Sequence, residues 1–154
     1  MRTTTTSTDA NTNEEERDEM PREKRISHVL RELKIKTGVL RRLSKEREMY
    51  EREVLDFTSR IEKDERIDRN DDDETNDNNN NNNNARQRKQ CLEESKAMVR
   101  DTFVRLEKAF VDLEEFVETL VEGKEDFDVR DEVTGKEEFR LAKEQVERVK
   151  PSLC

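Results

Sequence analysis

Few residues of this chain could take part in acid–base, nucleophilic or metal chemistry, and those few are scattered. The single histidine, His28, stands among basic residues, with no cysteine or aspartate at a catalytic or zinc-binding spacing. Cys91 and Cys154 form neither a CxxC pair nor a disulfide framework, which is typical of a reducing compartment. The sequence contains no glycine-rich phosphate loop. We therefore expect a protein that is not an enzyme and that uses no cofactor and no metal.

The charged side chains offer a different chemistry, which is the binding of a partner of opposite charge. Charged residues make up 46% of the 154 residues, and the net charge of −9 argues against nucleic acid or an anionic membrane as the partner. Residues 21–50 nevertheless carry ten Lys and Arg against four Asp and Glu, whereas residues 101–132 carry twelve acidic residues against four basic ones. The basic segment either pairs with the acidic one inside the fold or attracts an acidic partner.

Long helices must position these charges. From Ile26 onward, alternating three- and four-residue steps form a heptad seam, which predicts a first helix over about 24–66. Ile35, Val39 and Met49 widen its apolar surface, as a helix with two neighbours requires. Gly38 marks either a close approach of two helices or a partner's contact point. The seam positions are Ile26, Val29, Leu33, Lys36, Leu40, Leu43, Arg47, Tyr50, Val54, Phe57 and Ile61.

A second helix is predicted over about 85–122, with Asn84 as its N-cap and Gly123 as its stop. Its seam consists of Leu92, Val99, Phe103, Leu106, Phe110, Leu113, Val117 and Leu120. A second stripe, which again favours packing against two partners, consists of Ala97, Val104, Val111 and Phe116. Phe127 and Val129 are expected to anchor the acidic connection that follows. The capping-box spacing from Thr134 to Glu137 then predicts a third helix over 135–150, ended by Pro151.

The remaining segments are too polar to join a core. Residues 1–22 are predicted to be a disordered tail, and residues 68–84, which include Asn78–Asn84, a disordered asparagine-rich insert. Only 29% of the residues are hydrophobic, which suits a thin seam between long helices better than a thick core. We predict an all-α fold, an elongated up-down-up three-helix bundle with coiled-coil-like packing over residues 23–150. No apolar run is long enough to span a membrane, and we expect a cytoplasmic protein.

The first predicted helix also resembles a known family. The run Ile35–Val39, followed by Arg42-Leu43, Lys45-Glu46, Met49-Tyr50 and Glu53, is similar to the first helix of the tubulin-specific chaperone A (tubulin-binding cofactor A) family. Weaker similarity follows in Leu92–Ser95, Met98, Arg105–Glu107, Asp112-Leu113, Glu137–Phe139, Ala142 and Val149-Lys150. The similarity covers about residues 33–150 outside the asparagine insert, and its most specific part is the run from Lys36 to Tyr50.

This resemblance implies a monomeric three-helix rod that captures β-tubulin after its release from the chaperonin and holds it for αβ-heterodimer assembly. It implies a cytoplasmic, cytoskeleton-associated protein, with other tubulin-folding cofactors as further candidate partners. Leu43 and Tyr50 are assigned to the core. The candidate contacts to β-tubulin are the polar members of the matching run: Lys36, Thr37, Arg41, Arg42, Lys45, Glu46 and Glu53. The alternative is a coiled-coil scaffold that self-associates or binds microtubules through the same heptads.

Overall fold

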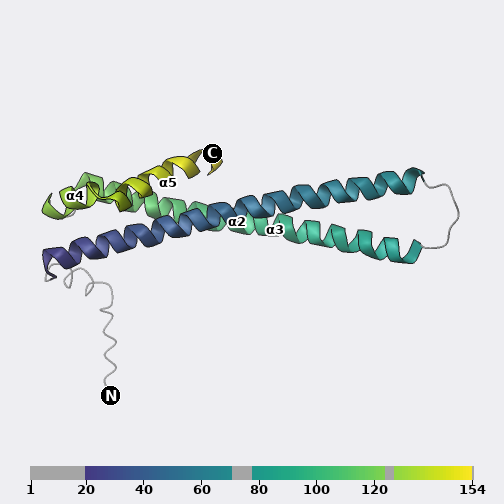
Figure 1. Ribbon diagram of the computed structural model, residues 1–154, viewed down its shortest axis with the longest axis horizontal. Coiled ribbons are helices and arrows are strands. Elements are labelled where there is room, and N and C mark those ends of the chain that lie inside the picture. The colour runs from purple at the N-terminus through teal and green to yellow at the C-terminus, as the bar shows by residue number, and fades with distance from the viewer. Residues whose placement is uncertain (1–19, 71–77, 124–126, 154) are drawn as a thin grey trace, which may run out of the picture.

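All the secondary structure that the computed structural model describes, in residues 20–70, 78–123 and 127–153, is helical (Figure 1). Helix α2 spans Arg22–Asn70, α3 spans Asn78–Glu122, α4 spans Phe127–Thr134 and α5 spans Glu137–Leu153. The 49 residues of α2 extend over about 75 Å at 1.5 Å per residue, which makes the molecule elongated. The predicted all-α fold is confirmed.

Helices α2 and α3 form an antiparallel hairpin. Lys36 of α2 meets Asp112 of α3 at 2.6 Å, and Glu46 meets Arg105 at 3.7 Å. Near the far end of the hairpin Asp64 pairs with Arg88. The partner's number falls along α3 as the residue number rises along α2, so the two helices run in opposite directions. Gly123 ends α3 as predicted, with a φ of +78° that glycine adopts without strain.

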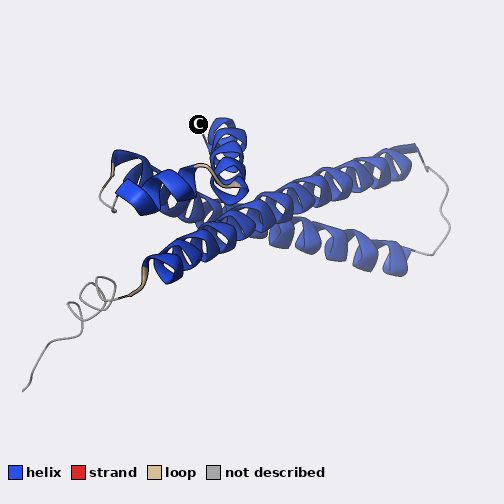
Figure 2. Cartoon of the chain, turned by 60° about the vertical axis from the view of Figure 1, so that its left-hand side comes forward, coloured by secondary structure: helices blue, strands red, loops and turns tan. Residues whose placement is uncertain are grey.

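The dry core lies in only one half of this hairpin, where α4 and α5 pack on it (Figure 2). Its apolar side chains come from the first part of α2, from the last part of α3, and from α4 and α5. Leu33, Leu40, Leu113, Val133 and Ala142 have no exposed surface. The full set is Ile26, Val29, Leu33, Leu40, Leu43, Leu106, Phe110, Leu113, Val117, Leu120, Val129, Val133, Phe139, Ala142 and Val149.

Among the residues that the structure describes, the other half consists of α2 and α3 alone, and its apolar seam is thin. Val54, Phe57 and Ile61 of α2, and Val99 and Phe103 of α3, are only partly buried. The buried side chains that α3 contributes there are polar, Ser95 and Thr102. The Ser95 hydroxyl donates a hydrogen bond to Glu53 at 3.3 Å, and the Thr102 hydroxyl donates to the Met98 carbonyl at 2.6 Å. Two helices alone cannot enclose large apolar side chains, so the seam of this half stays partly exposed to solvent.

Several predicted helix boundaries were wrong. Helix α2 continues to Asn70 and α3 begins at Asn78, so parts of the predicted insert are helical, and Asn84 is no N-cap. Each residue added to an existing helix gains one backbone hydrogen bond, which offsets the modest helix penalty of asparagine. Residues 71–77, and the predicted tail as far as residue 19, lie outside the described residues.

The connection before α5 also differs from its prediction. Residues 127–134 form the short helix α4, which is held by Val129 and Val133, one turn apart and both fully buried. Val129 thus anchors the segment as expected, whereas the Phe127 side chain lies outside the described residues. Thr134 is the last residue of α4, and its hydroxyl donates to the Asp131 carbonyl at 3.3 Å, so it does not cap α5.

Pro151 does not end α5, which continues to Leu153. A proline in the last turn removes only one backbone donor, and tertiary contacts hold the turn in place. The Ser152 carbonyl accepts a hydrogen bond from Arg47 at 3.1 Å, and Leu153 packs against the core. The turn is therefore fastened to α2 on its outer side and to the core on its inner side.

The predicted widening of both apolar stripes was largely wrong. Ile35 and Met49 of α2 are 55% and 47% exposed, and Val104 and Val111 of α3 are 63% and 43% exposed. Ala97 is exposed as well, whereas Val39 and Phe116 do pack against the core. Helix α5 has only 17 residues, so it reaches one side of the hairpin over part of its length. The remaining apolar residues have no third helix to meet.

Candidate functional site: the outer face of α2

One face of the first half of α2 points away from every other helix. Its central row consists of exposed residues at alternating three- and four-residue steps, which places them along one line of the helix. We call this surface the outer face of α2. It comprises Arg31, Lys34, Ile35, Gly38, Arg41, Arg42, Lys45 and Met49.

The cations of the outer face are not neutralised within the fold. Arg31, Lys34, Arg41, Arg42 and Lys45 form no ion pair with another residue in the described ranges. Among the described residues, Lys36 pairs with Asp112 and Arg22 pairs with Glu132, and both acidic residues belong to the segment 101–132. Of the two explanations for the basic segment, pairing with the acidic segment therefore accounts for part of it. The five cations of the outer face form a positive surface in contact with solvent.

The predicted site residues separate into two groups. Arg41, Arg42 and Lys45 lie together on the outer face, as expected. The other four candidates are turned toward neighbouring helices: Lys36, Thr37, Glu46 and Glu53. The structure therefore brings three of the seven together on one open surface.

The inward group makes contacts within the fold. Lys36 bonds Asp112 and stands over the Phe116 ring, 5.5 Å from its centroid. Glu46 pairs with Arg105, and Glu53 accepts a hydrogen bond from Ser95. Thr37 is 6% exposed, and its hydroxyl donates to the Leu33 carbonyl at 2.6 Å. The expectation that Thr37 is exposed was wrong, because its position on α2 falls on the side that is covered.

Gly38 has open space around it. A Cβ built at this position meets no atom within 4 Å, so the glycine serves no close approach between helices of the described fold. A glycine inside an exposed stretch of helix costs roughly 1 kcal/mol relative to alanine. This geometry excludes the first explanation for Gly38, a close approach of two helices, and contact with a partner stays a prediction.

Ile35 and Met49 belong to the outer face, although sequence reasoning assigned them to packing. They stand one turn before Gly38 and one turn after Lys45, and both are about half exposed. The seam positions of α2 never include them, and this offset is the signal that could have placed them outside. Together with the cations they make the outer face basic at its centre and apolar at intervals, which suits an acidic partner with some apolar surface.

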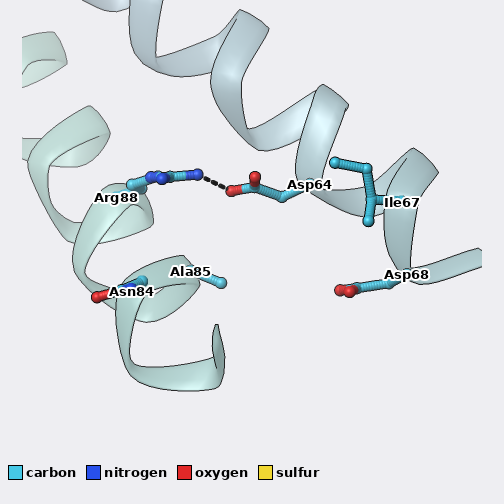
Figure 3. Close-up of a pocket in the computed structure, with 6 residues that line it drawn as sticks. All are labelled: Asp64, Ile67, Asp68, Asn84, Ala85 and Arg88. Atoms are coloured by element: carbon cyan, nitrogen blue, oxygen red, sulfur yellow. Dashed lines mark hydrogen bonds and ion pairs between the residues drawn. The ribbon is translucent and has the colours of Figure 1, made fainter. Parts of the chain in front are cut away.

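Other parts of the described structure offer fewer groups that could bind a partner or a ligand. A small cavity near the far end of the hairpin is lined by Asp64, Ile67, Asp68, Asn84, Ala85 and Arg88, and the Arg88–Asp64 ion pair crosses it (Figure 3). This pair fastens α2 to α3 there. In the described ranges, no three His, Cys, Asp or Glu side chains lie close enough together to hold a metal ion. None of the helices with described positions combines the length and the hydropathy needed to cross a bilayer.

Comparison with known proteins gives one family. The tubulin binding cofactor A family model matches residues 28–146. Tubulin-specific chaperone A of Gallus gallus is 32% identical over 121 residues, which cover 79% of this chain and 93% of that protein. The Mus musculus protein of the same name is 37% identical over 90 residues, which cover 58% of this chain and 73% of its own length.

A solved structure agrees with the sequence relatives. The structure of human tubulin chaperone cofactor A has a TM-score of 0.56 and 34% identity, and the alignment covers 79% of this chain and 98% of that one. The residues that match the family model come from all four described helices and include the whole outer face of α2. The chain therefore belongs to the tubulin binding cofactor A family.

Proposed function

We propose that this chain is a tubulin-folding cofactor that captures β-tubulin after its release from the chaperonin and holds it for αβ-heterodimer assembly. The observation that carries the proposal is the family match over residues 28–146, which spans the bundle. The relatives it resembles are named tubulin-specific chaperones, and the family is named for tubulin binding. The activity requires no cofactor, and the chain acts as a cytoplasmic, cytoskeleton-associated monomer whose partners include other tubulin-folding cofactors.

The outer face of α2 is the proposed contact surface for β-tubulin. From Arg31 to Lys45 the helix rises about 21 Å, so its cations stand in a row on a rigid support. They carry no ion pairs with described residues that would have to break before a partner binds. Charges at such a surface accelerate the encounter and select an acidic partner, while Ile35 and Met49 supply apolar contact. Covering a surface of β-tubulin in this way keeps it from unproductive association.

In this proposal Arg41, Arg42 and Lys45 contact β-tubulin directly. Lys36 acts as a support, because its ammonium group is held between Asp112 and the Phe116 ring and keeps α2 in register with α3. Glu46 and Glu53 also serve the hairpin, through Arg105 and Ser95. Thr37 lies inside and has no part in binding.

The experiment that tests the function uses β-tubulin newly released from chaperonin. Incubation with the purified chain is expected to give a complex of one chain with one β-tubulin, resolved by native gel and mass measurement. The complex should pass its β-tubulin to heterodimers when α-tubulin and the other cofactors are added. Binding to polymerised microtubules without capture of free β-tubulin, or self-association of the chain alone, would instead favour the scaffold.

A further inference from the structure

A groove begins where α5 ends. Helix α5 stops beside the middle of the hairpin, and beyond it only α2 and α3 continue (Figure 1). The Ser152 carbonyl, in the last turn of α5, accepts a hydrogen bond from Arg47 of α2 at 3.1 Å. Arg47 also pairs with Glu51, one turn further along α2, at 2.9 Å. Glu51 is one of the residues that line the groove, with Val54, Leu55, Lys96, Val99 and Arg100.

Both walls of this groove continue the surfaces on which α5 lies. On α2, Arg47, Glu51 and Leu55 follow one another at four-residue steps and share one face of the helix. On α3, Glu114 meets Lys150 of α5 at 3.6 Å. Going back along α3 from Glu114, alternating steps of four and three residues reach Phe110, Glu107, Phe103, Arg100 and Lys96. The groove therefore lies further along the same faces of α2 and α3 that the last turns of α5 contact.

The burial of the seam shows what a third helix contributes. In the half that α5 covers, Leu40 and Leu106 are 0% and 1% exposed. In the groove, Val54 and Val99 are only partly buried, and Leu55 is 70% exposed. A third helix placed in the groove would bury these three side chains. Burial of large apolar side chains is the main source of affinity at such helix-in-groove contacts.

The charged residues of the groove determine which charges a docked helix must carry on the side that faces α3. Where α5 lies, the α3 wall presents Glu114, and α5 meets it with Lys150. In the groove the same wall presents cations, Lys96 and Arg100. Arg100 has no ion pair with any residue in the described ranges, and Lys96 pairs only with Glu93 of its own helix. The matching occupant carries acidic residues on the flank that faces α3.

We infer that the groove of Val54, Leu55 and Val99 docks an amphipathic helix of the β-tubulin client, with its acidic flank on Lys96 and Arg100. This inference rests on the proposed function and adds a second contact, in the two-helix half, to that of the outer face of α2. The docked helix completes a three-helix bundle along the rest of the hairpin. Capture by two separate surfaces also fixes the orientation of the client, which one charged row cannot do.

Paired variants test the groove. Leu55→Glu with Arg100→Glu places two carboxylates in it at exposed positions, and β-tubulin binding is expected to weaken by about tenfold or more. The matched control, Val104→Glu with Lys108→Glu, makes the same change of net charge at exposed positions of α3 outside the groove lining and should bind within about twofold of the unmodified chain. Circular dichroism should show unchanged helicity for both variants.

The outcomes separate the two proposals. If the unmodified chain captures β-tubulin and the groove variant binds it equally well, the inference about the groove is wrong, while the proposed function is unaffected. Failure of the unmodified chain to capture β-tubulin overturns the function and the groove together. A photo-crosslinker attached at Leu55→Cys, in a chain with Cys91→Ser and Cys154→Ser, should label an acidic helical segment of β-tubulin. Labelling of a second copy of this chain, or of a non-helical segment, contradicts the inference.

Discussion

At the scale of single residues, two features meet on the outer face of α2. Its cations lack ion pairs with described residues, although glutamates are abundant in the chain. It also contains Gly38 with open space around it, in a helix of 49 residues where alanine would be more stable. Gly38 does not contribute to the stability of the helix, and the proposed contact with β-tubulin gives it a role.

Gly38→Ala is expected to raise the free energy of unfolding by about 0.5–1 kcal/mol, because the added methyl group meets nothing and alanine favours the helix. Urea unfolding followed by circular dichroism measures this change. Gly38→Gln keeps a good helix former but adds bulk to the outer face, and we expect it to weaken β-tubulin capture without loss of stability. Full capture by Gly38→Gln would remove Gly38 from the proposed contact surface.

Thr37→Val should leave β-tubulin capture unchanged, because the side chain is buried and its hydroxyl bonds only the Leu33 carbonyl of its own helix. Its effect on stability should stay within about 1 kcal/mol, since a hydroxyl bonded to the preceding turn adds little to a helix. Affinity measured beside the urea midpoint checks both statements. A specific loss of affinity at normal stability would restore Thr37 to the contact surface.

At the scale of elements, the hairpin could be predicted because the heptad spacing of apolar residues in each helix identifies the positions that face its partner. Leu33, Leu40, Leu106 and Leu113 are buried as their spacing predicts. The heptad pattern of one helix does not predict where a third helix ends. Ile35 and Met49 were therefore assigned to packing, although α5 lies on a different side of α2. The short helix α4 was not predicted, because two valines one turn apart are too short a pattern to indicate a helix.

The two halves of the hairpin should differ in their response to truncation. Leu40→Ala removes a fully buried side chain where α5 covers the seam, and it should cost about 2–5 kcal/mol of unfolding free energy. Leu55→Ala, at a position that is 70% exposed, should cost under about 1 kcal/mol. Urea unfolding of both variants gives the comparison. Equal losses would mean that another surface covers Leu55 in the free chain.

At the scale of the whole molecule, the chain is a rod. One half has a buried core covered by α4 and α5, and the other half has, among the described residues, only the partly exposed seam between α2 and α3. The three candidate contacts Arg41, Arg42 and Lys45 lie near the junction of these halves, before the groove that follows α5. Their clustering could be predicted from the family resemblance, but their separation from Lys36, Glu46 and Glu53 could not. Which polar residues of a helix face outward depends on the direction of its neighbours, and this is a property of the assembled bundle.

The free chain is expected to be a monomer, because its apolar groove is flanked by charges and its remaining exposed apolar residues are separated along the helices. Sedimentation equilibrium should give a mass near 18.4 kDa that does not change with protein concentration. Sedimentation velocity should show the high frictional ratio of a rod about 75 Å long. A mass that doubles with concentration would favour the self-associating scaffold.

The most direct test of the central claim is the affinity for β-tubulin of a chain with the outer face reversed in charge. Arg41→Glu, Arg42→Glu and Lys45→Glu together should weaken binding by roughly tenfold or more, with helicity unchanged. The control reverses Lys63, Arg66 and Arg69, which are also exposed cations of α2 without ion pairs among the described residues, and gives the same net charge. The proposal predicts near-normal binding for this control. Equal affinities of the two variants, or normal capture by the first, would contradict it.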